Sequence, residues 1–123
     1  MSTQQRVIVL GASPKRERYS NQAVRLLVQY GHEVVPVNPA QSLIEGIPVA
    51  SSLDEIDGRV DTVTLYLSPK HSSGIADALL RLKPGRVIFN PGTENPELKR
   101  RLVDNDIGVE DACTLVMLKT EQF

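Results

Sequence analysis

The chain has 123 residues, with no tryptophan and only one cysteine. A lone Cys113 excludes an internal disulfide bond and any metal site built from several thiolates, and we expect a buried structural thiol there. Three Tyr and two Phe are too few for a surface on which single-stranded bases would stack. Lys and Arg number 14 against 15 Asp and Glu, so no basic excess favours nucleic acid or an anionic membrane as partner.

Long hydrophobic runs are also missing. No apolar stretch approaches the roughly 18 residues that cross a bilayer, and residues 1–6 lack the apolar core of a signal peptide. We therefore expect a cytoplasmic protein. The apolar fraction of 41% and the charged fraction of 24% are ordinary for a globular protein, and they indicate a single domain over residues 1–123 with a proper core.

What the chain does contain is a series of short apolar runs that end in Gly or Pro. These runs predict strands at 6–10, 33–38, 62–67 and 86–90, with a weaker fifth strand at 108–110. Continuous apolar runs of this length are typical of parallel strands buried on both faces. Pro36 lies inside the second run and indicates a bulge or an outer position there.

Segments of helical periodicity fill the gaps. Helices are predicted at 20–30 and 72–82, with a helical turn at 52–56 and a last short helix at 112–118. A further helix opens at Asn95 and Pro96, a cap and a first-turn proline, and Ser20 is the expected cap of the first helix.

This alternation predicts an α/β fold. With right-handed crossovers, the arrangement is a Rossmann-like, doubly wound, five-stranded parallel sheet in the order 3-2-1-4-5, between two layers of helices. Ligands of such sheets bind beyond the carboxyl ends of the strands, where the strand order reverses. Here that point is predicted between the first and fourth strands.

Four strand ends on this rim are small, polar or rich in Gly and Pro, so that backbone could approach a ligand closely. They are residues 11–13, 38–39, 66–69 and 90–93. Gly and Pro also serve simply to end strands, but four such loops on one rim favour a binding site.

The first loop discriminates between nucleotides. The dinucleotide fingerprint has a second Gly where this chain has Ser13, and an acidic residue after the second strand where this chain has Asn38. The loop instead carries Lys15, Arg16 and Arg18. Basic side chains ahead of a helix N-terminus suit a ligand with phosphates, although surface cations are also common without one.

Motifs of common enzymes are not found. The chain has no Walker A pattern and no nucleophile elbow, and no acid–base pair stands out by spacing. His32 follows Gly31 at a helix C-terminus, where a partly charged ring is favourable. His71 lies on the predicted rim, where capping or exposure is the simpler role and a phosphate or ribose contact the alternative.

Several motifs together resemble a known family. Gly11-Ala12-Ser13 with its basic loop, and the segments 35–39, 90–94 and 111–118, look like the small single-domain CoA-binding proteins. These are similar to the N-terminal CoA-binding domain of the succinyl-CoA synthetase α subunit. The resemblance covers nearly the whole chain and implies coenzyme A or an acyl-CoA as the ligand. The synthetase also needs a further domain with a phosphorylated histidine, so we do not expect a free-standing ligase.

The resemblance also implies a place for each loop along the ligand. Gly11, Ala12 and Ser13 would meet the CoA phosphates, and Lys15, Arg16 and Arg18 would face them, including the 3′-phosphate. Asn38 and Pro39 would border the adenosine. Tyr66, Leu67 and Ser68 would line the middle of the ligand, and Pro91, Gly92 and Thr93 would lie near the pantetheine end.

Three functions remain open from the sequence. The first is a non-enzymatic CoA-binding module that acts as a sensor, a carrier or a subunit of a partner enzyme. The second is an NAD(P)-binding domain, because the basic loop could accept a 2′-phosphate. The third is an enzyme acting on an acyl-CoA, for which no general base is recognised. The apolar segment 115–118 could pack on its own sheet or on a second copy, and a mixed disulfide of Cys113 with a thiol ligand is a further hypothesis.

Overall fold

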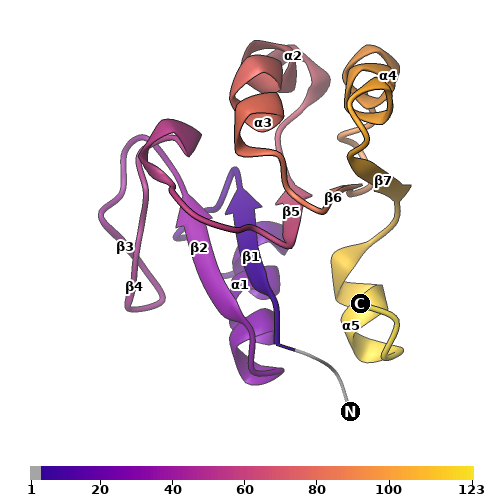
Figure 1. Ribbon diagram of the computed structural model, residues 1–123. Coiled ribbons are helices and arrows are strands. Elements are labelled where there is room, and N and C mark those ends of the chain that lie inside the picture. The colour runs from indigo at the N-terminus through magenta and orange to yellow at the C-terminus, as the bar shows by residue number, and fades with distance from the viewer. Residues whose placement is uncertain (1–3) are drawn as a thin grey trace.

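Five parallel strands form the main sheet of the computed structural model, which describes residues 4–123 (Figure 1). The strands are β1 (Arg6–Leu10), β2 (Glu33–Val37), β5 (Thr62–Leu65), β6 (Arg86–Phe89) and β7 (Gly108–Asp111), in the order β2-β1-β5-β6-β7. Each coincides with a predicted run to within two residues at its ends. The α/β, doubly wound architecture predicted from the sequence is confirmed.

One place in the strand order is filled by different residues than predicted. We expected the run 62–67 outside the second strand, but β5 pairs directly with β1, so that Val63 lies opposite Ile8. The place outside β2 is taken by Ala50 alone, which forms a parallel bridge with Val37. If this bridge is numbered as the third strand in chain order, β5 becomes the fourth strand and β6 the fifth. The sheet then reads 3-2-1-4-5, followed by β7.

Burial explains this correction. Every residue of β5 is buried, which suits a strand that has neighbours on both sides better than a strand at the edge of a sheet. The strand order therefore reverses between β1 and β5, and not beside the run 86–90 as predicted. Pro36 does have the outer position expected of it, because β2 is the last full strand on its side.

Helices cover both faces of the sheet (Figure 1). They are α1 (Tyr19–Gln29), α2 (Pro69–Ser72), α3 (Ala76–Leu82), α4 (Pro96–Asp104) and α5 (Thr114–Lys119), with 3₁₀ turns η1 (Leu53–Glu55) and η2 (Ser73–Ile75). Val7 and Val9 pack with α1 and α5, whereas Ile8 and Leu10 pack with α3 and α4. This alternation follows from the two-residue period of a strand.

The helix ends confirm one predicted cap and correct another. Asn95 Oδ1 accepts a hydrogen bond from Leu98 N at 3.1 Å, with Pro96 in the first turn of α4. The first helix instead begins at Tyr19, and Ser20 is buried inside its first turn, where it makes no capping bond. The predicted helix 72–82 is divided into α2, η2 and α3.

A short hairpin between β2 and η1 was not predicted. Its strands are β3 (Leu43–Ile44) and β4 (Ile47–Pro48), which pair antiparallel. Glu45 and Gly46 form the turn with φ of +52° and +75°, as a two-residue type I′ turn requires. Glu is not among the residues that favour this turn, which is why the sequence pattern did not reveal it.

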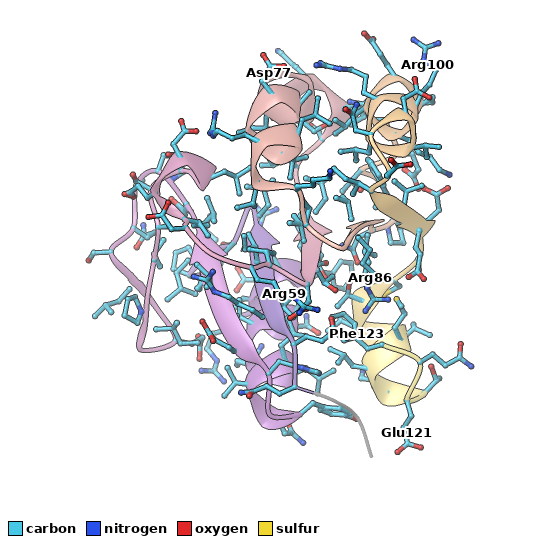
Figure 2. The ribbon with its side chains drawn as sticks, viewed as in Figure 1. Arg59, Asp77, Arg86, Arg100, Glu121 and Phe123 are labelled. Carbon is cyan, nitrogen blue, oxygen red and sulfur yellow. The ribbon has the colours of Figure 1, made fainter. Side chains whose placement is uncertain are left out.

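His32 is buried and not partly charged as predicted. Its Nδ1 accepts a hydrogen bond from Gln5 N at 3.0 Å, and the Phe123 ring lies 5.2 Å from its centroid. The Arg86 guanidinium lies over the Phe123 ring, with its carbon 4.6 Å from the ring centroid (Figure 2). Burial, and secondly the Arg86 charge, lower the pKa of His32. The direction of this pKa shift is opposite to the one that a helix C-terminus would favour.

Asn90 joins three elements at the carboxyl edge of the sheet. Its Nδ2 donates to Thr64 Oγ1 at 2.7 Å and to Leu65 O at 2.9 Å, and its Oδ1 accepts from Thr114 N at 2.9 Å. The side chain is buried, so each of these bonds is made without competition from water.

Replacing Asn90 tests this junction. Asn90→Ala should lower the free energy of unfolding by about 2–4 kcal/mol, because buried polar partners lose their bonds. Asn105→Ala is the matched control, since Asn105 is exposed and its side chain donates to Arg101 O within the same helix end, and it should change stability by about 0.5 kcal/mol or less. Chemical denaturation measures both. Equal effects of the two substitutions would contradict the assignment.

The burial of His32 predicts a pH dependence of stability. Since the folded state lowers the pKa of His32, the unfolded chain binds more protons once the pH falls below about 6.5. The stability contributed by neutral His32 is therefore present above that pH and is lost as the pH falls toward the folded value. Denaturation between pH 8 and 5 should show this loss, and His32→Gln should reduce it. An unchanged slope in the variant would argue against His32 as its source.

Candidate functional site

The turn after β1 requires glycine. Gly11 has a φ of +89°, and a Cβ there would lie 2.9 Å from Leu67 Cδ2 and 3.1 Å from the carbonyl carbon of Tyr66. A left-handed conformation and so close an approach both exclude a larger residue. The N–H groups of Gly11 and Ala12 donate to Val37 O at 3.3 and 3.1 Å. The turn is therefore held between the ends of β2 and β5, where the strand order reverses.

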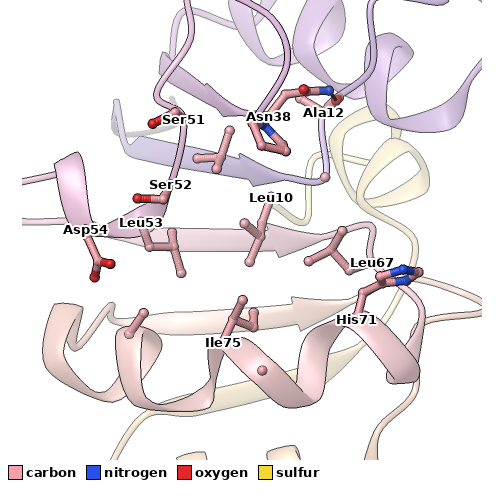
Figure 3. A pocket seen from close by; sticks show the side chains of 15 residues that line it. Leu10, Ala12, Asn38, Ser51, Ser52, Leu53, Asp54, Leu67, His71 and Ile75 are labelled. Atoms are coloured by element: carbon pink, nitrogen blue, oxygen red, sulfur yellow. Dashed lines mark hydrogen bonds between the residues drawn. The ribbon is translucent and has the colours of Figure 1, made fainter.

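A cleft of about 510 Å³ opens on one side of this turn (Figure 3). Its apolar side chains converge from β1, η1, η2 and the loop between β5 and α2, and include Leu10, Leu53, Ile75 and Leu67. Polar residues at its edge are Ser51, Ser52, Asp54 and His71. A cavity of this size with an apolar floor and a few polar groups is typical of small-molecule sites.

A second hollow of about 370 Å³ also reaches Gly11. Ser13, Lys15 and Arg18 line it together with Tyr19 and Ser20, the first residues of α1. The N–H groups of the first helical turn have no partner within the helix. Two cations and free backbone donors suit an anionic group.

The structure divides the predicted site residues into three groups. The apolar cleft is lined by Gly11, Ala12, Asn38, Pro39 and Leu67. The basic hollow is lined by Gly11, Ser13, Lys15, Arg18 and Tyr66. Neither is lined by Arg16, Ser68, Pro91, Gly92 or Thr93.

Each residue of the third group has another partner or another place. Arg16 Nη1 lies 3.1 Å from Glu45 Oε1, and Ser68 Oγ lies 2.9 Å from His71 Nδ1. The segment 91–93 follows β6, one strand beyond the point where the order reverses. Its distance from the two hollows follows from the position of β5 between β1 and β6.

Asn38 acts as a connector between loops. Its Nδ2 donates to Ala12 O at 2.8 Å, and its Oδ1 accepts from Ala40 N at 2.7 Å. Both ends of the amide are thus engaged within the protein. Asn38 therefore supports the Gly11 turn and borders the cleft, but it does not replace the acidic residue that holds a ribose in dinucleotide sites.

Tyr66 forms part of the wall of the basic hollow. Burial raises the pKa of its phenol to about 12, against the opposing influence of the Thr64 and Thr114 hydroxyls. The phenol is therefore neutral at physiological pH, and because its hydroxyl oxygen is buried, this oxygen is not part of the exposed surface of the hollow. Cys113, expected to be buried, is half-buried and precedes α5.

Several lining residues were missed by the sequence prediction. Ser51, Ser52, Leu53 and Asp54 lie before and within η1, and Gly74, Ile75 and Ala78 lie in η2 and α3. The signal available was the helical turn predicted at 52–56, but nothing local showed that it faces the Gly11 turn.

Two features are absent from residues 4–123. No three His, Cys, Asp or Glu side chains among them are arranged to hold a metal ion. No helix in that range is long and apolar enough to cross a membrane.

Comparison with known proteins places this chain in a family. Residues 5–119 match the family model described as CoA binding domain. The uncharacterized protein YneT of Bacillus subtilis is 31% identical over 97 residues, which are 79% of this chain and 72% of YneT.

Solved structures share the fold over nearly the whole chain. An uncharacterized protein with 41% identity superposes with a TM-score of 0.93 over 99% of this chain and 100% of that one. A Thermus thermophilus protein with 28% identity has a TM-score of 0.88 over 98% of this chain and 91% of its own. A dinucleotide-forming acetyl-coenzyme A synthetase of Ca. Korarchaeum cryptofilum shares the fold at 21% identity and a TM-score of 0.75, over 88% of this chain and 25% of the synthetase. The chain belongs to the CoA-binding domain family.

Proposed function

We propose that this protein binds coenzyme A or an acyl-CoA across the Gly11 turn and catalyses no reaction by itself. The observation that carries the proposal is the junction of an apolar cleft and a basic hollow at one glycine. Coenzyme A has both kinds of surface, since it joins a nucleoside and a pantetheine arm through phosphates. Membership of the CoA-binding domain family supports the same ligand.

The two hollows suggest how the ligand is divided. The phosphates would bind Lys15, Arg18 and the free N–H groups of α1, with Ser13 Oγ as an additional donor. The adenosine would occupy the apolar cleft bordered by Asn38 and Pro39. This division places the negatively charged phosphates beside the cations of the basic hollow. It places the adenosine on the apolar floor of the cleft, where burial of apolar surface is favourable.

A dinucleotide is less well supported. Ser13 stands where the fingerprint has its second glycine, and both polar ends of Asn38 are already bonded within the protein. Neither of the two contacts typical of NAD recognition is thus offered by these loops.

Location and assembly form part of the proposal. We infer a cytoplasmic protein, because the thiol of Cys113 is free and free thiols persist in reducing compartments. A binding module of this kind would pass its ligand to, or report it to, a partner enzyme or a second copy. Native mass spectrometry reports the retained ligand and the subunit number together.

One contact favours a second candidate, an enzyme that cleaves an acyl-CoA thioester. Ser68 Oγ and His71 Nδ1 are 2.9 Å apart at the edge of the cleft, which is the distance of a nucleophile from its base. The contact also fits a simple structural role, since Ser68 O accepts from the N–H groups of His71 and Ser72 where α2 begins.

Ligand binding tests the main proposal. By isothermal titration, coenzyme A should bind at least about tenfold more tightly than NAD⁺, and 3′-dephospho-CoA should bind more weakly than coenzyme A. Arg18→Ala should weaken coenzyme A binding by about 3- to 30-fold through loss of a charged hydrogen bond. The control Arg100→Ala removes an exposed arginine of α4 (Figure 2) and should have no effect. Equal binding of coenzyme A and NAD⁺ would overturn the proposal.

A turnover assay separates binding from catalysis. Incubation with acetyl-CoA and longer acyl-CoA thioesters should release no thiol above the uncatalysed rate. If thiol is released, and Ser68→Ala abolishes the release while coenzyme A binding persists, the enzymatic candidate replaces the non-enzymatic one. His71→Gln distinguishes a base from a residue that only positions Ser68.

A further inference from the structure

The guanidinium of Arg16 is bonded to an acidic residue far along the chain. Its Nη1 lies 3.1 Å from Glu45 Oε1, in the turn of the β3–β4 hairpin. The Glu45 side chain is 21% exposed and that of Arg16 is 68% exposed. Arg16 lines neither hollow, whereas its neighbours Lys15 and Arg18 line the basic one.

The second carboxylate oxygen of Glu45 is also engaged. Glu45 Oε2 accepts from Asn21 Nδ2 at 3.2 Å, and the same nitrogen donates to Ser13 O at 2.9 Å. Asn21 belongs to α1 and is completely buried. The hairpin turn, the start of the basic loop and the helix are therefore joined at one amide.

Arg25 completes the arrangement one helical turn further on. Its Nε donates to Asn21 Oδ1 and its Nη2 donates to Arg16 O, both at 2.9 Å. We call Arg16, Asn21, Arg25 and Glu45 the loop clamp. The clamp holds the loop 13–18 at two points, at its start through Ser13 O and at its middle through the backbone and side chain of Arg16.

The backbone at Glu45 is consistent with a requirement for its carboxylate. Its φ of +52° is left-handed, a region that costs a residue with a Cβ about 1–2 kcal/mol. Asn before Gly is favoured in this type of turn. A glutamate held in that conformation by two side-chain bonds points to a role outside the hairpin, as strained residues at functional sites do.

We propose that Glu45 is a positioning residue of the anion-binding hollow and that Arg16 serves the loop clamp, not the ligand. This inference rests on the proposed function and deepens it. The clamp shapes the loop 13–18 so that Lys15 and Arg18 line the hollow, and it neutralises Arg16 with an internal carboxylate. The phosphate-binding cations are then Lys15 and Arg18, whereas the family resemblance implied all three.

Glu45→Asn is the informative substitution. Asn followed by Gly46 keeps a favoured type I′ turn, while the shorter side chain no longer reaches Arg16. The hairpin should therefore remain folded and only the clamp should be lost. The control Glu33→Gln disrupts another ion pair, with Arg6 at 3.0 Å, at the start of β2 and at the opposite end of the strands from the loop.

The first measurement needs no ligand. Amide hydrogen exchange is followed at Lys15 and Arg18, whose N–H groups bond to Ser13 Oγ and Lys15 O within the loop. Glu45→Asn should accelerate their exchange by about 3- to 10-fold, and Glu33→Gln should leave it unchanged. Unchanged exchange in Glu45→Asn overturns the clamp, whatever the protein binds.

The second measurement uses coenzyme A in isothermal titration. Glu45→Asn and Arg16→Ala should each weaken binding about 3- to 10-fold, and the double variant should be no weaker than either, because both remove one interaction. Arg18→Ala should add its own loss to either variant. If Glu45→Asn bound coenzyme A more tightly, Glu45 would be competing with the ligand for the cations of the loop, and the inference would be overturned. Accelerated exchange in a protein that binds no coenzyme A would refute the proposed function while supporting the clamp.

Discussion

The close approach of Gly11 to the end of β5 is the constraint on which the candidate site depends. With no Cβ, the turn after β1 lies against Leu67 and Tyr66 and still directs two N–H groups to Val37 O. It therefore brings the carboxyl ends of β2, β1 and β5 together. Gly11 itself lines both the apolar cleft and the basic hollow.

Three buried or partly buried asparagines form hydrogen bonds that connect neighbouring loops and elements. Asn38 connects the Gly11 turn to the loop after β2, Asn21 connects the basic loop to the β3–β4 hairpin, and Asn90 connects β5 and β6 to the start of α5. Each amide uses both its donor and its acceptor within the protein. Loops connected in this way are ordered before a ligand arrives, so binding costs less conformational entropy.

Most of the fold could be predicted because its signals are local. Apolar runs ended by Gly or Pro indicated four of the five strands of the main sheet, a weaker run indicated the fifth, and Asn95 with Pro96 indicated the start of α4. The pairing of β5 with β1 could not be predicted, because an apolar run indicates a strand but does not indicate which other strand will pair with it. The hairpin was missed because Glu45 adopts a left-handed turn conformation against its own preference. His32 was misjudged because its ring contact with Phe123 and the charge effect of Arg86 come from residues distant in sequence.

By itself, the sequence determined the parallel strands and the glycine turn after the first of them, since Gly11, Ser13 and the basic residues behind them are read directly from the chain. Its departures from the dinucleotide fingerprint and its basic loop favoured coenzyme A over NAD. Only the tertiary structure decided which cations line the hollow, that Asn38 is a connector, and that η1 and α3 close the cleft. The physical reason is that Arg16 forms an ion pair with Glu45, which is 29 residues away in the sequence. Contacts at that separation depend on how the elements pack and not on any local pattern.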